Sequence, residues 1–426
     1  MAFGAVWRES GAPLYLSLEA GALALSLAGR ENWSFDGEGR LVGAWIEKVT
    51  YRRALDNRVL AKRVDPARPG RRLRRFLGEM EIAALLGRAG ATAARVRAGL
   101  ASGALTIASG AELAAPYLEW LERAAEWTPA RYAAEAGRFA AVYQPIPILP
   151  PDQYMALVVQ ATEGCSYNEC SFCTFYRDRP FRIKRLDELR AHVAGVLGLL
   201  GRGVALRRKL FLADANAVVV AQRTLLPMLD ALNAALPILP GELEGAARAA
   251  WVGAYPWHLD GMYAFVSAPD ALRKSAGDFA DLRARNLRRV YVGLETGCDP
   301  LRRFLRKQGG AADVRAAVET MKAGGLHLGV IFMAGIGGAA YRAAHFADTV
   351  ALLKALPLGP GDLVYVSPFV TDAESPYAAD AQAAGLCPLD EMETGEEEAR
   401  FRAALLPWAQ ARGVKLSRYD VREFVY

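Results

Sequence analysis

Apolar runs of strand length alternate with helical segments from residue 155 to residue 367 of this 426-residue chain. The runs that we predict to be strands are 155–161, 209–214, 250–255, 289–295, 326–333 and 363–367. The segments between them, such as 186–200 and 311–323, have the apolar spacing of helices. This alternation predicts an α/β fold with a parallel sheet and right-handed crossovers. Functional residues of such sheets lie at the carboxyl ends of the strands.

The remaining sequence predicts two further parts. Residues 14–64 have a strand-like pattern with a hairpin-turn signal at Asp36-Gly37, and residues 73–139 are rich in helix-forming residues. Four prolines between positions 145 and 151 predict a stiff connector, because proline fixes its own backbone and keeps the preceding residue extended. We therefore expect an N-terminal accessory domain at 1–150, an α/β domain at 151–370 and a helical C-terminal extension at 371–426 that packs on it.

Composition and charge narrow the class of protein. Hydrophobic residues make up 53% of the chain and charged residues 23%, as in soluble globular proteins. Five cysteines, three of them clustered, argue against a disulfide scaffold and predict a reducing, cytoplasmic location. We predict no secretory signal and no membrane span.

The net charge of +6 does not favour nucleic acid as a partner. A small basic cluster is formed by Arg71, Arg72, Arg74 and Arg75. We interpret it as the solvated start of a helix, with contact to a phosphate or a polyanion as the alternative.

Three cysteines, Cys165, Cys170 and Cys173, lie within nine residues on a loop between the first predicted strand and the next helix. Iron–sulfur clusters are usually held by four cysteine thiolates, so three leave one iron without a protein ligand. An open metal position is what a catalytic site needs. Structural zinc would require a fourth ligand, and the nearest histidine, His192, lies well inside the following helix. Free structural thiols are the remaining alternative.

This stretch resembles the radical S-adenosylmethionine (SAM) superfamily. The usual motif of that family has three residues in the first gap and two in the second. Here the first gap holds four residues, 166–169, and the second holds Ser171 and Phe172. The resemblance runs from about Tyr154 to the C-terminus and is closest to a branch related to methylthiotransferase and cobalamin-dependent enzymes. It implies a partial (β/α)6 barrel, a [4Fe-4S] cluster and SAM.

The resemblance also implies an activity. The cluster would give one electron to SAM, and the resulting 5′-deoxyadenosyl radical would abstract hydrogen from a substrate that the sequence does not identify. The electron would come from a donor such as flavodoxin or ferredoxin. Two alternatives stay open: an enzyme that modifies tRNA or another RNA gripped by the N-terminal domain, and an iron–sulfur sensor without enzymatic activity.

SAM contacts are implied at the ends of two predicted strands. Asp214 and Asn216 follow the second strand, where the family binds the amino group of SAM. Capping of the next helix is the alternative for Asp214. Glu295 ends the fourth strand in a Gly-Leu-Glu-Thr-Gly segment similar to the Gly-Leu-Glu-Ser-Gly of the family. It would reach the ribose or the amino acid end of SAM, and an internal ion pair is the alternative.

Four more residues complete the expected cofactor site. Phe172 precedes the last cysteine, where the family often has an aromatic residue. Gly335 lies in a glycine-bearing segment after the fifth strand that resembles the segment beside the adenine, and Ser367 lies near the adenine face on the sixth strand. Tyr255 ends the third predicted strand and is expected to line the pocket. The sequence has no second cysteine cluster, and its N-terminal region has no Asp-x-His-x-x-Gly loop for cobalamin.

Overall fold

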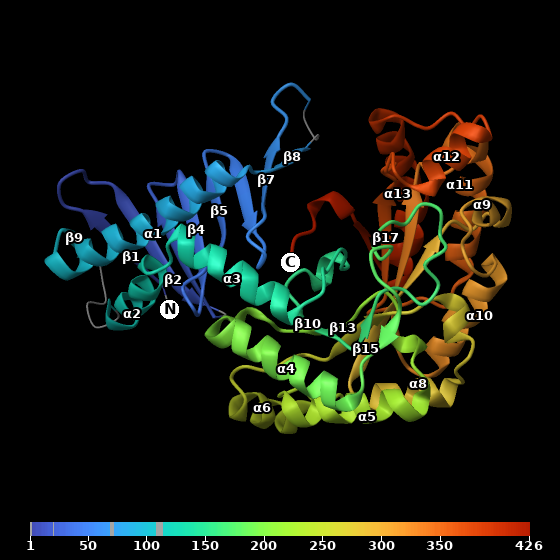
Figure 1. The fold of residues 1–426 in the computed structure, drawn as a ribbon, viewed down its shortest axis with the longest axis horizontal. Coiled ribbons are helices and arrows are strands. Elements are labelled where there is room, and N and C mark those ends of the chain that lie inside the picture. Colours follow the sequence, from blue (N-terminus) through green and yellow to red (C-terminus); the bar gives the residue numbers. More distant parts are fainter. Residues whose placement is uncertain (1, 20, 69–71, 108–113) are drawn as a thin grey trace. The chain divides into compact units, whose positions relative to one another are not determined.

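The computed structural model describes residues 2–19, 21–68, 72–107 and 114–426, and the chain forms two compact units (Figure 1). The first unit comprises Met1–Ile146, His192–Arg208 and Arg422–Tyr426. The second comprises Pro147–Ala191 and Lys209–Val421. A middle segment and the C-terminal end of the chain therefore belong to the same unit as the N-terminal region.

The first unit is built on a nine-stranded antiparallel sheet with the order β8-β7-β6-β5-β4-β3-β2-β1-β9. Its strands are β1 (Ala2–Trp7), β2 (Pro13–Glu19), β3 (Ala22–Leu27), β4 (Glu31–Asp36), β5 (Leu41–Ile46), β6 (Val49–Arg53), β7 (Val59–Val64), β8 (Arg72–Phe76) and β9 (Leu105–Ile107). From β1 to β8, each strand pairs with the next one in the chain. The turn signal at Asp36-Gly37 correctly predicts the antiparallel pairing of β4 with β5.

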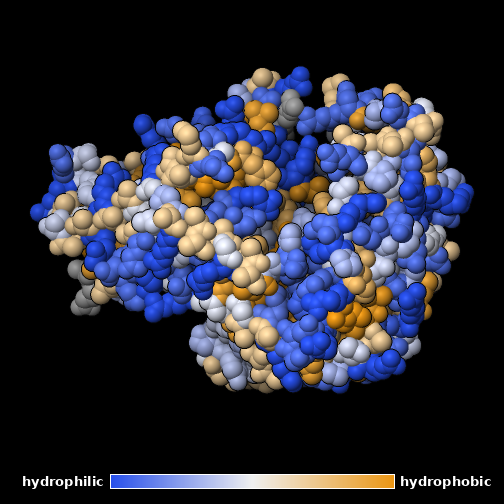
Figure 2. Space-filling model, viewed as in Figure 1, coloured by the Kyte–Doolittle hydropathy of each residue, from blue (hydrophilic) through white to orange (hydrophobic). Residues whose placement is uncertain are grey.

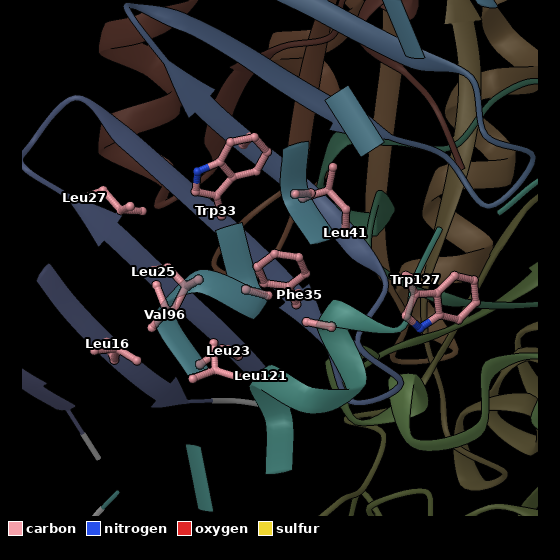
Figure 3. Packing of buried hydrophobic residues seen from close by; sticks show 14 of the residues in the cluster. Leu16, Leu23, Leu25, Leu27, Trp33, Phe35, Leu41, Val96, Leu121 and Trp127 are labelled. Atoms are coloured by element: carbon pink, nitrogen blue, oxygen red, sulfur yellow. The ribbon is translucent and has the colours of Figure 1, made fainter. Parts of the chain in front are cut away.

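Three helices, α1 (Glu79–Ser102), α2 (Ala114–Ala125) and α3 (Pro129–Val142), complete the core of this unit. Alternate residues of a strand face the same side of a sheet, and in β3 these are the buried Leu23, Leu25 and Leu27. Figure 3 shows these leucines and Trp33 of β4 in one cluster with Val96 of α1. The core thus joins one face of the sheet to the helices.

Buried Arg40 explains why part of α4 (Leu186–Leu200) belongs to the first unit. Its guanidinium pairs with Asp36 at 2.7 Å and with Glu135 at 2.6 Å, and Nη1 donates to the carbonyl of Leu199 at 2.9 Å. A buried charge is tolerated when it is paired and hydrogen-bonded. The C-terminal end of α4 supplies part of that pairing.

The basic cluster is not at the start of a helix. Arg72, Arg74 and Arg75 lie on β8, an edge strand that pairs with β7, and α1 begins only at Glu79. Arg71 lies outside the described residues. The helical interpretation failed because arginine favours helices in isolation, whereas pairing with a neighbouring strand overrides that preference.

The second unit contains a seven-stranded sheet in which every neighbouring pair is parallel. Its strands, in sheet order, are β10 (Leu157–Gln160), β13 (Leu210–Ala213), β14 (Met262–Phe265), β15 (Leu287–Glu295), β16 (His327–Ala334), β17 (Leu363–Pro368) and β18 (Lys415–Arg418). The predicted α/β fold with a parallel sheet is confirmed. Five of the six predicted strands are present, and β18 is a seventh strand that the sequence analysis did not predict.

Helices connect these strands. They are α5 (Gln222–Ala235), α6 (Gly245–Ala254), α7 (Ala268–Ala271), α8 (Ala276–Ala284), α9 (Asp299–Phe304), α10 (Ala311–Ala323), α11 (Gly338–Ala355), α12 (Pro376–Ala383) and α13 (Glu391–Arg412). Every residue of β10, β13 and β17 is buried, as expected for parallel strands that are covered on both faces. The face of the molecule in Figure 2 is mostly hydrophilic, with smaller hydrophobic areas.

The third strand was predicted in the wrong place. Residues 245–254 form helix α6, and the strand is β14, which begins at Met262. A short apolar run cannot be assigned to a strand or a helix by periodicity alone, and this run is rich in alanine, the best helix former. Tyr255 therefore ends a helix instead of a strand, and 45% of its surface is exposed.

Among the described residues, one helical stretch, Leu186–Leu206, is long and apolar enough to cross a membrane by length and composition. Core helices of soluble proteins meet the same criterion. Here Leu189, Val196 and Leu200 are buried within the protein.

Candidate functional site

The three cysteines lie on a long loop that is closed at its base by a short ribbon. After β10 the chain forms β11 (Thr162–Glu163), which pairs antiparallel with β12 (Arg182–Ile183), so residues 164–181 leave and return at one place. Burial alone would raise the pKa of Glu163. Hydrogen bonds from Arg182 and Lys184 instead lower it to about 2. The base of the loop is therefore held by charged hydrogen bonds as well as by strand pairing.

Within the loop, Cys165, Cys170 and Cys173 are free thiols and partly buried. The guanidinium of Arg177 donates to the carbonyls of Cys170 and Cys173, at 2.9 Å each, and so fixes the turn that carries both. In the four-residue gap, Asn168 has a φ of 54°, a left-handed conformation that asparagine tolerates well. Its backbone N–H lies 3.4 Å from the sulfur of Cys165. The longer gap is thus accommodated by an ordered turn.

The loop is attached to the rest of the second unit through its middle. The backbone N–H of Ser171 donates to the carbonyl of Leu305, and the carbonyl of Ser171 accepts from the N–H of Tyr377, at 3.0 Å each. Phe172 packs against a buried cluster that includes Cys298 and Met333. The expected site residue Phe172 is therefore part of the packing that positions the cysteines.

Burial raises the pKa of the Cys170 thiol and raises that of Cys173 to about 11. Ionisation of Cys165 would raise both further, so the thiols are electrostatic neighbours, and Lys307 partly offsets these effects. Thiolates at these positions would need a positively charged centre to stabilise them. A bound metal provides such a charge, and its binding to cysteine releases the thiol protons.

Within the described part of the chain, no three His, Cys, Asp or Glu side chains are gathered as ligands of one metal ion. A four-iron cluster bonds each thiolate to a different iron, so its ligands are spaced more widely than those of a single ion. The donor set consists of three soft thiols, which suit iron–sulfur centres. The residues present fit such a cluster, with one iron left open.

Asp214 lies at the carboxyl end of β13 and supports the base of the cysteine loop. It is 1% exposed, and its carboxylate accepts from Gln160 at 2.9 Å, from the backbone N–H of Gly164 at 3.0 Å and from Arg179 at 3.3 Å. Burial raises its pKa, and these donors partly oppose that effect. The carboxylate thus contacts the residue directly before Cys165, and a helix-capping role is not observed.

Asn216 links the same loop to the next strand connection. Its Nδ2 donates to the hydroxyl of Ser166 at 2.9 Å and to Asp270 at 2.6 Å, and its Oδ1 accepts from the N–H of Ser267 at 3.3 Å. Asn216 is 3% exposed. It therefore holds the first gap of the cysteine motif in place.

Glu295 ends β15 with a φ of 60° and forms the internal ion pair that was the alternative to a SAM contact. Its Oε1 accepts from Nζ of Lys307 at 2.8 Å. Among the described residues, Lys307 is the only hydrogen-bond donor to this carboxylate. Burial would lower the pKa of Lys307, but Glu295 and the nearby thiol of Cys170 raise it. A cation and a carboxylate therefore lie beside the cysteines.

The loop after β15 is held by residues that the sequence analysis did not select. Arg302 is 1% exposed and donates to the carbonyls of Leu294 at 2.5 Å and Thr296 at 3.2 Å. The hydroxyl of Thr296 lies 2.7 Å from Nδ1 of His345, whose Nε2 lies 2.7 Å from the carbonyl oxygen of Met333. Their signal in the sequence was weak, because each acts through contacts with distant strands.

Burial lowers the pKa of His345 to about 4, although the carbonyl of Met333 and the carboxylates of Glu397 and Asp348 oppose the shift. An unfolded histidine titrates near 6.5. The unfolded chain therefore binds the extra proton first, and this group's contribution to stability, present above pH 6.5, is lost as the pH falls toward 4. The shift is worth about 3 kcal/mol in the free energy of unfolding.

A His345→Gln variant should show a flatter dependence of stability on pH in this window, measured by urea unfolding. A His258→Gln variant, which keeps His345, should retain the wild-type slope. Equal slopes for wild type and His345→Gln would contradict the prediction.

Two of the remaining expected residues lie at the same edge of the sheet. Gly335 follows β16 with a φ of 88°, and a Cβ there would lie 3.0 Å from Thr394 Oγ1. Ser367 lies near the end of β17 and is 5% exposed. The cysteine loop, Asp214 and Glu295 also follow strand ends, and the carboxyl ends of parallel strands share one edge. Tyr255, at the end of α6, is not part of this set.

Comparison with known proteins gives structural matches only. No family model and no curated protein matches the chain. The matching solved structures include the cobalamin-dependent SAM radical enzyme OxsB, at 12% identity and a TM-score of 0.36 over 63% of this chain and 33% of that chain. Coproporphyrinogen III oxidase (HemN) from Escherichia coli matches at 13% identity and a TM-score of 0.42 over 64% and 56%. The methyltransferase TsrM from Kitasatospora setae matches at 15% and 0.38 over 58% and 45%.

These three structures are radical SAM enzymes, the superfamily that the cysteine loop resembles. The chain spans about a third of the length of OxsB and about half of the other two.

Proposed function

We propose that this chain is a radical SAM enzyme, in which Cys165, Cys170 and Cys173 hold a [4Fe-4S] cluster and SAM binds at the fourth iron. One observation carries the proposal. The three thiols lie on one anchored loop at the carboxyl edge of a parallel sheet, and Asp214 after β13 and Glu295 at the end of β15 lie at the same edge. When bound, the cluster supplies the electron that cleaves SAM to methionine and the 5′-deoxyadenosyl radical that takes hydrogen from the substrate.

The sheet of the second unit is accordingly proposed to be the partial (β/α)6 barrel of this superfamily. The six strands from β10 to β17 would form the barrel, and β18 would extend it by one strand. A one-electron donor such as flavodoxin or ferredoxin would supply the reducing equivalent.

The residues of the chain divide the work between holding the loop and binding SAM. Asp214 and Asn216 are buried and bonded to the cysteine loop, so we assign them a positioning role. Among the described residues, Glu295 accepts a hydrogen bond only from Lys307, which leaves capacity for the ribose hydroxyls or the ammonium group of SAM. Gly335 and Ser367 are proposed to lie beside the adenine. Phe172 packs against the apolar cluster of Cys298 and Met333 and is proposed to position the cysteine loop.

Anaerobic reconstitution of the full chain tests the proposal. We expect four iron and four sulfide per chain, an electron paramagnetic resonance signal of the reduced cluster that changes when SAM is added, and formation of 5′-deoxyadenosine under strong reductant. A cluster that neither binds nor cleaves SAM would indicate the sensor alternative.

Glu295→Gln should weaken SAM binding by roughly 1.5–3 kcal/mol, the range for hydrogen bonds to charged groups, without loss of iron. A matched Glu319→Gln change, on the exposed surface of α10, should leave SAM affinity unaltered. Equal SAM affinity in wild type and Glu295→Gln would refute the assignment of Glu295.

A further inference from the structure

Positive charge is concentrated in one short part of the first unit. Residues 49–76, which span β6, β7 and β8, contain ten Lys and Arg and only two Asp. This segment alone therefore exceeds the +6 net charge of the whole chain, and the rest of the sequence is slightly acidic. The modest total charge conceals a strongly basic segment.

Strand pairing brings four of these basic residues, Lys62, Arg63, Arg74 and Arg75, together around an open hollow of about 350 Å³. Across the three strands, Tyr51 pairs with Ala61 and Ala61 with Arg75, so the small alanine lies between two large side chains. Two residues further along β7, and therefore on the same face of the sheet, Arg63 pairs with Leu73 of β8. Both residues line the same hollow. The hollow thus combines a tyrosine ring, an apolar wall and two arginines. Figure 1 shows β8 at the edge of the sheet beside β7.

Few carboxylates neutralise this surface. Lys62 and Arg74 share Glu423, at 2.8 and 3.0 Å, and Arg75 pairs with Glu81. Arg63 is exposed and has no carboxylate partner among the described residues. Because alternate residues of a strand point to opposite faces of a sheet, Arg63 and Arg75 share the face of Tyr51, whereas Lys62, Arg72 and Arg74 lie on the other face. On the face of Tyr51, the described carboxylate that pairs with these arginines is Glu81.

Protection of an edge strand explains only part of this charge. Charged residues on β8 would prevent its free backbone edge from pairing with other chains. However, β7 is paired on both sides, with β6 and β8, so this need does not account for Lys62 and Arg63. A concave basic surface with an aromatic floor is the arrangement that binds unpaired bases by stacking and phosphates by charge.

We infer that the β6–β8 surface binds single-stranded RNA, with a base against Tyr51 and phosphates near Arg63 and Arg75. RNA is favoured over DNA because RNA presents unstacked bases in its loops and ends. DNA is mostly a duplex, which would keep its bases away from the hollow. RNA binding by this surface does not depend on the proposed function. The inference that RNA is also the substrate of the enzyme rests on that function. The sequence alone groups Arg71, Arg72, Arg74 and Arg75, whereas strand pairing adds Arg63 and Tyr51.

Fluorescence anisotropy with the full chain tests this inference without cluster or SAM, so it can fail separately from the proposed function. The probe is a labelled, unstructured RNA of about 16 nucleotides, titrated between about 50 and 200 mM salt. Arg63→Glu should weaken binding roughly tenfold and reduce the salt slope by about 0.7 for each lost phosphate contact. Arg63→Lys should retain most of the affinity. Tyr51→Leu should weaken binding with little change in the salt slope, because it removes stacking and leaves the charge.

The matched control is Arg8→Glu, an equal charge change at an exposed arginine that follows β1, near the opposite edge of the same sheet. It should leave RNA binding nearly unchanged. The inference is overturned if wild type does not bind at the lowest salt, if Arg8→Glu and Arg63→Glu weaken binding equally, or if duplex RNA or single-stranded DNA binds more tightly than the single-stranded RNA.

Discussion

Replacing Cys170 with alanine should abolish iron–sulfur loading of this chain. Its thiol is one of three on the loop, and the cluster that we propose already has one iron without a protein ligand. Two thiolates would leave half of the cluster without ligands. Iron, sulfide and visible absorption after anaerobic reconstitution measure the effect, and circular dichroism checks that the variant is folded.

The matched control is Cys387→Ala, which removes an exposed thiol far along the sequence from the loop. It should load as much iron as wild type. A full complement of iron and sulfide in Cys170→Ala, or zinc in place of iron in the wild type, would contradict the proposed cluster.

Asp214→Ala should destabilise the second unit by roughly 3 kcal/mol or more and impair cluster loading. The change removes hydrogen bonds from Gln160, Gly164 and Arg179 at a site that is 1% exposed, and each bond to a charged group contributes about 1.5–3 kcal/mol. Because Gly164 directly precedes Cys165, the base of the loop should loosen. Urea unfolding and the rate at which a thiol reagent modifies Cys165 report these two effects.

A second substitution at position 214 separates the contribution of the hydrogen bonds from that of the negative charge. Burial raises the pKa of Asp214, so its negative charge is costly and the hydrogen bonds are what stabilise. Asp214→Asn keeps the shape and one acceptor but places an NH2 group where the second carboxylate oxygen accepted a hydrogen bond, so it should cost about 1.5–3 kcal/mol, less than Asp214→Ala. The control Asp230→Ala, at an exposed ion pair with Arg285, should change stability by less than about 0.5 kcal/mol. Normal stability and normal iron loading in Asp214→Ala would show that this residue does not support the loop.

The two-unit organisation also affects how the chain can be divided. A cut in the proline connector near residue 147 would separate the nine-stranded sheet from His192–Arg208 and Arg422–Tyr426, which belong to the same unit. The buried pairing of Arg40 with Asp36, Glu135 and the end of α4 would be broken. The effect of such a cut on activity would therefore mix loss of stability with loss of function.

The sequence by itself determined the features that depend on local pattern. The apolar runs of β13, β15, β16 and β17 are mostly buried, and their strands were predicted nearly to the residue. The cysteine triplet was visible because its chemistry lies within nine adjacent positions. The run at 250–255 was wrongly predicted to be a strand, because a short apolar segment is compatible with both a strand and a helix.

Only the tertiary structure decided which distant side chains act together. The expected contact of Asp214 with SAM stays a prediction, and strand pairing and the return of the loop place Gly164 and Arg179 on its carboxylate. Lys307 joins Glu295 across twelve residues, and Arg63 joins Tyr51 and Arg75 only through the pairing of three strands. The SAM contacts of Glu295, Gly335 and Ser367 stay predictions. A single sequence records which residues a segment contains, whereas the partners of a buried charge are set by long-range packing, which no local pattern encodes.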